Sequence, residues 1–248
     1  MKIINNIKHR ISGLLVNRKR LSGIDEIDKS FEENGCAVIE NFLTKEECDE
    51  LVKVGEKVIV DYPARVRIES NGSDVRIYQI DEISDKFKND KLSKIDEWAE
   101  NFYKKANLKY FQMYGRIKYQ EGNLGSGSGW HRDSPFSHQF KFILYLCDVD
   151  QKNGPFQYIS GTNRDEKILE ISKKTGLDLQ KYRLSEDEVN NILHQVSGLN
   201  VITVTGKIGT LLIADVKGLH RGMPLESGVR MATTRYYFKD QVPSHLYK

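Results

Sequence analysis

The pattern of apolar and polar positions changes along the chain near residue 108. Before that point, apolar residues recur mostly at the three- and four-residue spacing of helices that bury one face. Thr44 and Glu47 have the spacing of a capping box at the start of one helix, and Gly35 suits the left-handed end of another. The predicted elements of this half are helices over about 25–34, 44–60 and 92–106, and strands over about 36–42 and 65–80 with a turn at 71–72.

After residue 108, short apolar segments separated by glycines predict strands. A charged insert over about 163–198 interrupts them, and Ser185 with Glu188 predicts a capped helix within it. We expect this insert to act as a lid over the substrate. We therefore expect residues 23–248 to form one mainly β domain with flanking α-helices, a double-stranded β-helix of the jelly-roll, cupin-like type. The predicted strands cover about 109–120, 139–147, 155–160, 199–205, 209–215 and 229–238.

Charge is distributed unevenly around a net value of +3. Residues 1–22 hold six Lys or Arg and no acid, which leaves 32 bases against 35 acids, or −3, in the rest. Helical spacing of apolar residues over 3–15 predicts a basic amphipathic helix in this segment. Such a helix packs on the body, contacts a partner, or lies on an anionic membrane surface, here through residues 1–20. The mildly acidic body argues against a nucleic-acid partner.

The cysteines bear on location. Cys36, Cys48 and Cys147 are scattered and odd in number, which is typical of reduced thiols in the cytoplasm. No apolar run is long enough to cross a membrane, and the N-terminus lacks the pattern of a secretory signal. We therefore expect a cytoplasmic protein, with peripheral contact at the inner membrane surface as the alternative.

Candidate chemistry centres on the stretch Gly129-Trp130-His131-Arg132-Asp133. In an extended segment, residues two apart point the same way, so His131 and Asp133 converge while their neighbours face elsewhere. A third ligand is required, and His220 in Leu219-His220-Arg221-Gly222 is the best candidate. Two histidines and one carboxylate form the facial triad of non-haem Fe(II) oxygenases, which leaves positions open for a co-substrate and dioxygen.

These motifs, together with the stretches 141–162 and 209–224 and the arginine at 230, carry a family resemblance. From about residue 34 to residue 238, the chain resembles the phytanoyl-CoA dioxygenase family of Fe(II)/2-oxoglutarate-dependent oxygenases. The resemblance implies the same jelly-roll fold, with Fe(II), 2-oxoglutarate and O2 as cofactor and co-substrates. It also implies that Arg230 binds the distal carboxylate of 2-oxoglutarate, for which a guanidinium is well matched.

The sequence departs from the family at two points near this arginine. The family's arginine often stands one residue further from the last histidine, and a hydroxyl residue often stands where this chain has Gly222. Arg235 lies five residues after Arg230, hence on the opposite face of a strand, and is the poorer candidate. Lys141 and Tyr145, four apart on one strand, share a face and are predicted to line the pocket near co-substrate or substrate.

The resemblance implies oxidative decarboxylation of 2-oxoglutarate coupled to attack on an unactivated C–H bond. Related halogenases lack the carboxylate ligand, so Asp133 argues for hydroxylation. The predicted substrate is a small molecule, with a sugar of a cell-surface glycan or a lipid-linked precursor as one suggestion. The alternative is a non-catalytic, cupin-like protein that binds a metal or 2-oxoglutarate. A nucleic-acid demethylase is disfavoured because the body has no basic excess.

Overall fold

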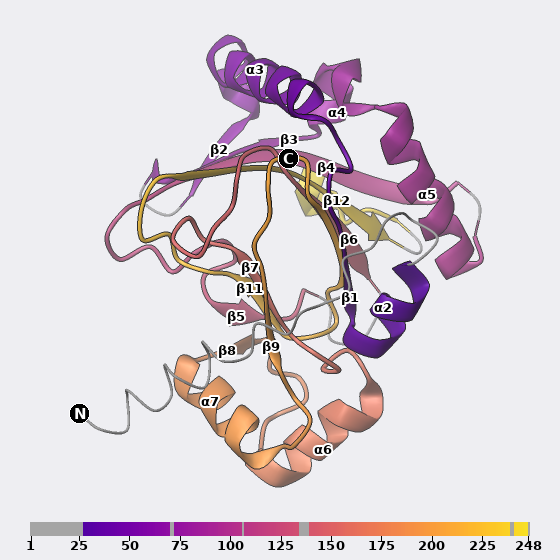
Figure 1. The fold of residues 1–248 in the computed structure, drawn as a ribbon, viewed down its shortest axis with the longest axis vertical. Helices are drawn as coiled ribbons and strands as arrows, with labels where there is room; N and C mark the ends of the chain where they lie inside the picture. Colours follow the sequence, from indigo (N-terminus) through magenta and orange to yellow (C-terminus); the bar gives the residue numbers. More distant parts are fainter. Residues whose placement is uncertain (1–26, 70–71, 106, 134–138, 239–240, 248) are drawn as a thin grey trace.

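Two antiparallel sheets face one another in a computed structural model of the protein, which describes residues 27–69, 72–105, 107–133, 139–238 and 241–247 (Figure 1). The larger sheet has the order β1-β10-β6-β12-β4-β3-β2, and the smaller has the order β8-β5-β11-β7-β9. Neighbours far apart in sequence identify a jelly roll, as predicted. The larger sheet contains β1 (Cys36–Ile39), β2 (Val66–Glu69), β3 (Asp74–Tyr78), β4 (Lys109–Lys118), β6 (Phe140–Tyr145), β10 (Leu211–Asp215) and β12 (Val229–Phe238).

The smaller sheet contains strands that sequence patterns miss. It comprises β5 (Trp130–His131), β7 (Phe156–Ile159), β8 (Arg183–Leu184), β9 (Val201–Val204) and β11 (His220–Gly222). We predicted β7 and β9 but not β5, β8 or β11, because two or three residues are too few to show an alternating pattern. These three short strands are held by pairing with their neighbours in the sheet rather than by local propensity.

Helices cover the outer face of the larger sheet (Figure 1). Both predicted capping boxes are present, at Thr44 and at Ser185, and the first helix ends at Gly35 with φ 76°. Phe31, Trp98 and Phe140 pack edge to face between helices and sheet, with ring centroids 5.0–6.3 Å apart. The helices are α2 (Ile27–Asn34), α3 (Lys45–Asp61), α4 (Ile80–Ile83), α5 (Asp90–Tyr103), α6 (Asp165–Thr175) and α7 (Glu186–Gln195), with short 3-10 turns at Pro63–Arg65, Asp85–Phe87 and Ser244–Tyr247.

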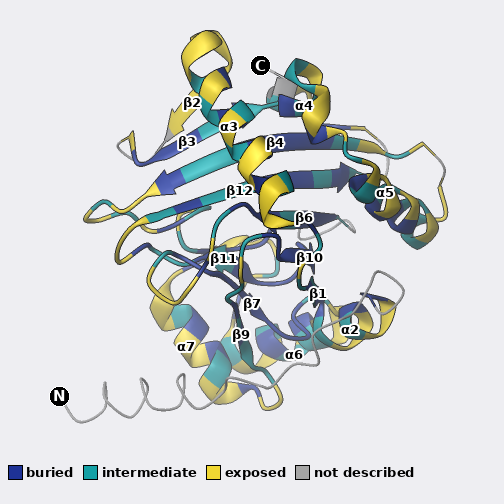
Figure 2. Cartoon of the chain, turned by 45° about the horizontal axis from the view of Figure 1, so that its top comes forward, coloured by how far each residue is buried: buried dark blue, intermediate teal, exposed yellow. Residues whose placement is uncertain are grey.

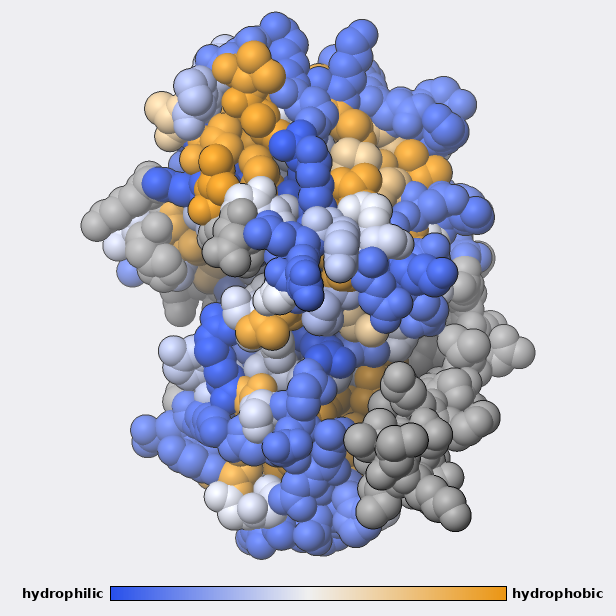
Figure 3. Space-filling view, turned by 90° about the vertical axis from the view of Figure 1, so that its left-hand side faces the viewer, coloured by the Kyte–Doolittle hydropathy of each residue, from blue (hydrophilic) through white to orange (hydrophobic). Residues whose placement is uncertain are grey.

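The insert differs from the predicted lid. Its helices α6 and α7 pack beneath the smaller sheet with their own hydrophobic cluster, which joins Ile171 and Ile192 of the insert to Trp130 and Leu219 of the sheet. The surface at that end of the molecule is mostly hydrophilic (Figure 3). Burial of one apolar face against the sheet makes α6 and α7 a third layer of the fold, so neither helix lies over the pocket as a lid.

Burial follows the layers of the fold, and strands covered on both faces, such as β7 and β10, are buried at every residue. The strands at the centre of the larger sheet are mainly buried, while the outward faces of the covering helices are exposed (Figure 2). Within the described ranges, no helix combines the length and apolar character that a bilayer span requires. The predicted amphipathic helix and the membrane contact through residues 1–20 lie outside the described residues.

Candidate metal centre and co-substrate pocket

The three predicted metal ligands meet between the two sheets. Residues His131 on β5 and His220 on β11 are direct partners in the smaller sheet, although 89 positions separate them in the chain. Asp133 follows β5 and lies 3.2 Å from His131 Nε2 and 3.6 Å from His220 Nε2. One potential ligand atom from each residue lies within 4.8 Å of the other two. Strand pairing thus assembles the centre that the sequence predicted.

Backbone contacts orient both imidazoles. Nδ1 of His131 lies 2.8 Å from the carbonyl of Gly129, and Nδ1 of His220 lies 2.9 Å from that of Gly218. An Nδ1–H that donates to a carbonyl leaves Nε2 as the lone pair available to a metal. Burial, together with the neighbouring cation Lys141, lowers the pKa of His220 to about 3, so this imidazole is neutral at physiological pH.

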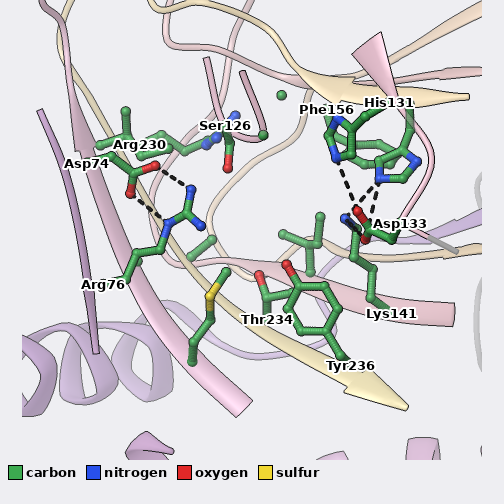
Figure 4. A pocket seen from close by; sticks show the side chains of 18 of the residues that line it. Asp74, Arg76, Ser126, His131, Asp133, Lys141, Phe156, Arg230, Thr234 and Tyr236 are labelled. Atoms are coloured by element: carbon green, nitrogen blue, oxygen red, sulfur yellow. Dashed lines mark hydrogen bonds and ion pairs between the residues drawn. The ribbon is translucent and has the colours of Figure 1, made fainter. Parts of the chain in front are cut away.

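The donor set fits a divalent cation. Two imidazole nitrogens and one carboxylate match the facial triad of non-haem iron. The ammonium of Lys141 lies 3.0 Å from Asp133 Oδ2 and 3.0 Å from His220 Nε2, so these groups already accommodate a positive charge (Figure 4). Burial opposes ionisation of Asp133, but Lys141 and the two imidazoles hold its pKa well below its usual range. An anionic carboxylate and neutral imidazoles are the protonation states that metal binding requires.

Alternate residues of the larger sheet form the other wall of the pocket. On β6, Lys141, Ile143 and Tyr145 line it, as predicted for Lys141 and Tyr145 from their spacing. On β12, the lining residues are Arg230, Ala232, Thr234 and Tyr236. Because successive side chains of a strand point to opposite faces of the sheet, Arg235 lies on the face away from the pocket, also as predicted.

Arg230 lies beneath β11 at the position of Gly222. Its Nη1 donates to the carbonyl of Gly154, and burial lowers its pKa. A Cβ built at Gly222 would lie 3.0 Å from Arg230 Nη2 and 2.8 Å from the Cβ of Ser126. The absence of a side chain at 222 therefore makes room for the guanidinium, which explains one departure of this chain from the family pattern. His220 and Gly222 are two residues apart on β11, so the histidine that would hold the metal and the space that the Arg230 guanidinium occupies lie on one face of this strand.

The glycine-rich loop before β5 closes the pocket over these groups. A Cβ at Gly127 would lie 2.1 Å from the His131 ring, and one at Gly125 would lie 2.1 Å from the carbonyl of Gly222. Both glycines also have positive φ, at 82° and 83°. The loop approaches His131 and β11 more closely than any side chain would allow.

Tyr145 joins the two sheets at the base of the pocket. Its hydroxyl donates to the carbonyl of Val204 at 2.9 Å and accepts from the backbone N–H of Phe156 at 3.0 Å. Burial raises its pKa to about 12. The hydroxyl already has a donor and an acceptor in the protein, so Tyr145 positions β7 and the ring of Phe156. Its predicted co-substrate contact, like that of Lys141, stays a prediction.

The sequence reasoning missed a charged pair on β3. Arg76 donates from Nε and Nη2 to the carboxylate of Asp74, at 3.0 and 2.6 Å, and both residues line the pocket (Figure 4). Their alternation in Asp74-Val75-Arg76-Ile77 was the available signal, because Val75 and Ile77 face the buried outer side. The pocket also includes Arg183 from the insert, which we did not select.

Solved structures with this fold hold iron and the co-substrate. The epimerase SnoN, in complex with Fe3+, alpha ketoglutarate (2-oxoglutarate) and nogalamycin RO, is 13% identical with a TM-score of 0.63 and covers 88% of this chain and 90% of its own. EvdO2 from Micromonospora carbonacea var. aurantiaca, complexed with 2-oxoglutarate, is 13% identical with a TM-score of 0.60, and the match covers 87% of this chain and 91% of EvdO2. EctD from S. alaskensis with bound Fe is 18% identical with a TM-score of 0.62, and the match covers 84% of this chain and 74% of EctD. At these identities the likeness establishes the fold. No curated protein matches the chain significantly.

Fold and site together define a jelly-roll, non-haem iron oxygenase that uses 2-oxoglutarate. The sequence profile of the family described as Phytanoyl-CoA dioxygenase (PhyH) matches residues 31–232. The chain belongs to this family, and its cofactor and co-substrate are iron and 2-oxoglutarate. This membership confirms the predicted enzyme class and argues against the alternative of a non-catalytic binding protein.

Proposed function

We propose that the protein hydroxylates an unactivated C–H bond of a small molecule, with Fe(II), 2-oxoglutarate and O2. The observation that carries this proposal is the complete His131–Asp133–His220 constellation, with its ligand atoms within 4.8 Å of one another. A carboxylate at the third position leaves no room there for a halide, which supports hydroxylation over halogenation. The epimerase SnoN has a similar fold, so retention of one oxygen atom in the product is the point to be tested.

Each pocket residue has a defined task in this reaction. Nε2 of His131 and of His220 and one oxygen of Asp133 would hold the iron, which with its co-substrate and O2 supplies the oxidant for hydrogen abstraction. Arg230 would bind the distal carboxylate of 2-oxoglutarate through a charge-assisted pair of hydrogen bonds. Phe156, stacked 5.6 Å from the His220 ring, shields that side of the centre from water.

For the substrate, we propose a sugar of a cell-surface glycan or a lipid-linked precursor, supported by the charged and hydroxyl side chains among the lining residues, such as Arg76, Arg183 and Thr234. We also propose a cytoplasmic location. Its support is that the three cysteines are free thiols, two of them buried, as suits a reducing compartment.

An anaerobic titration tests the assignment of metal and co-substrate. Apo-protein receives Fe(II) and then 2-oxoglutarate, while the visible charge-transfer band of the chelate is followed. We expect the band in the wild type, its loss in His220→Ala, and a shift to higher 2-oxoglutarate concentration in Arg230→Ala. Iron binding without any band would contradict the co-substrate assignment.

Admission of O2 to the same samples tests turnover. Succinate should form at a low rate without substrate, and a panel of small molecules is then searched for a product that has gained one oxygen atom from 18O2. A product that turns over with succinate but gains no oxygen would replace hydroxylation with another outcome of hydrogen abstraction.

A further inference from the structure

The charges that line the pocket do not cancel once iron and co-substrate are counted. Asp74 and Arg76 neutralise one another through two hydrogen bonds. Under the proposed function, Arg230 balances the distal carboxylate, and Asp133 with the co-substrate's metal-binding carboxylate balances a divalent iron. Among the described charged residues of the lining, two positive groups remain: Lys141, deep in the pocket, and Arg183, at its rim.

Arg183 is built into the site by strand pairing. In the smaller sheet it is the direct partner of the metal ligand His131, so the two side chains share the pocket face. It belongs to β8, the edge strand that the insert contributes, and its side chain is exposed. Nη1 donates to the carbonyl of Gly127 at 2.5 Å, and the guanidinium lies 5.9 Å from the centre of the Tyr182 ring. A guanidinium has five N–H donors, so these contacts orient the group and leave other N–H donors available for a ligand.

The position of Arg183 separates it from the co-substrate. Bound as proposed, 2-oxoglutarate would extend along β11 from His220 to Gly222, where Arg230 lies. In the smaller sheet, β5 lies between β11 and β8, so Arg183 and the co-substrate site along β11 lie on opposite sides of His131. A ligand group held by Arg183 would therefore approach the metal from the open edge of the sheet, with the co-substrate already in place.

We propose that the substrate is an anionic small molecule, and that Arg183 binds its carboxylate or phosphate group at the rim of the pocket. This inference rests on the proposed function and names the chemistry of its substrate. A planar guanidinium forms two parallel hydrogen bonds with either oxyanion, and the nearby positive charge of Lys141 favours anions throughout the pocket. Arg183 is thus a specificity-determining residue, and the insert contributes it to the site.

Inorganic phosphate is the first probe, and acetate is the second. Anaerobic protein loaded with Fe(II) and saturating 2-oxoglutarate is titrated with each probe by calorimetry at constant ionic strength, while the chelate band is recorded. We expect wild type to bind at least one probe with the band retained, and the tighter probe identifies the oxyanion. Arg183→Gln should weaken binding at least about tenfold, because charge-assisted hydrogen bonds are lost. The affinity of Arg183→Lys should lie between those of the wild type and Arg183→Gln, because lysine keeps the charge but cannot form two parallel hydrogen bonds with one oxyanion.

Lys181→Gln is the matched control. It removes the same charge two residues away, where Lys181 pairs with Glu188 at 2.5 Å outside the pocket lining. Equal probe affinity in wild type and Arg183→Gln, an equal loss in Lys181→Gln, absence of binding in wild type, or displacement of 2-oxoglutarate by the probe would each overturn the inference. In these outcomes the chelate band still forms before the probe is added, whereas failure of the proposed function shows as absence of that band.

Discussion

Two buried arginines on strand β12 have opposite surroundings. Arg235, on the outer face, is 1% exposed and donates to Gln112 at 2.7 and 3.0 Å and to Asp96 at 2.5 Å, with its guanidinium 3.9 Å from the Tyr110 ring centre. Arg230, on the pocket face, is 7% exposed and donates to a backbone carbonyl. Within the described part of the chain, no carboxylate lies within ion-pair distance of Arg230.

The pKa shifts express the same contrast. Burial disfavours the charge of both guanidiniums, but Tyr237 and Asp96 more than offset this for Arg235 and raise its pKa. For Arg230 burial prevails, and its pKa is lowered. Removing one partner of a buried ion pair is costly to the fold, whereas a buried guanidinium that faces a pocket and has no ion-pair partner among the described residues is suited to bind an anion. The comparison therefore separates a structural arginine from a ligand-binding arginine on a single strand.

The largest expected effect on the pocket face comes from Asp133→Gly. Removal of the only carboxylate of the metal constellation should abolish 2-oxoglutarate turnover while the far-UV circular dichroism stays native. Succinate formation with added Fe(II) measures this. Near-normal turnover in the variant would contradict the assignment of Asp133 as a ligand.

On the outer face, Arg235→Met should reduce stability and leave the site intact. We expect a loss of about 3 kcal/mol, at the low end for a broken buried pair because the Asp96 side chain is 33% exposed. Urea unfolding measures the loss, and the chelate titration should give wild-type affinity for 2-oxoglutarate. A variant of wild-type stability with weakened 2-oxoglutarate binding would reverse the roles of the two arginines.

The reciprocal variant, Arg230→Met, sharpens the contrast. Loss of a charge-assisted pair should weaken 2-oxoglutarate binding by about tenfold to a hundredfold. Stability should be unchanged or higher, because methionine fills similar space without a buried charge. Thermal unfolding without ligand and the chelate titration are the two measurements. A fall in melting temperature comparable to that of Arg235→Met would argue for a structural role.

The smallest expected effect comes from Gly222→Ser. The new side chain must displace Arg230 or Ser126, since its Cβ would lie 3.0 Å from Arg230 Nη2. Overpacking of this kind should weaken 2-oxoglutarate binding about tenfold. Gly115→Ala is the control: it adds a methyl group to the same pocket, where the nearest atom is 4.0 Å away. Unchanged affinity in Gly222→Ser would show that Arg230 does not depend on the space at 222.

Local sequence was sufficient for the elements that carry their own signals. The capping boxes at Thr44 and Ser185, the end of α2 at Gly35, and the alternation that separates Arg230 from Arg235 are properties of a few neighbouring residues. Short-range chemistry decides each of them, so each was predicted. The metal ligands were also predicted, from motif spacing and the family resemblance.

Only the tertiary structure decided how distant segments combine. Strands of two or three residues such as β5, β8 and β11 exist because neighbouring strands supply their hydrogen bonds, so no local sequence pattern predicts them. Their pairing places Arg183 of the insert beside His131 at the pocket, while the helices of the insert pack beneath the smaller sheet. Likewise, the structure explains why Gly222 departs from the family pattern, because the guanidinium of Arg230 occupies the space that a side chain there would need. Amino-acid types along the chain determined which chemistry was available, and non-local packing decided where each group acts.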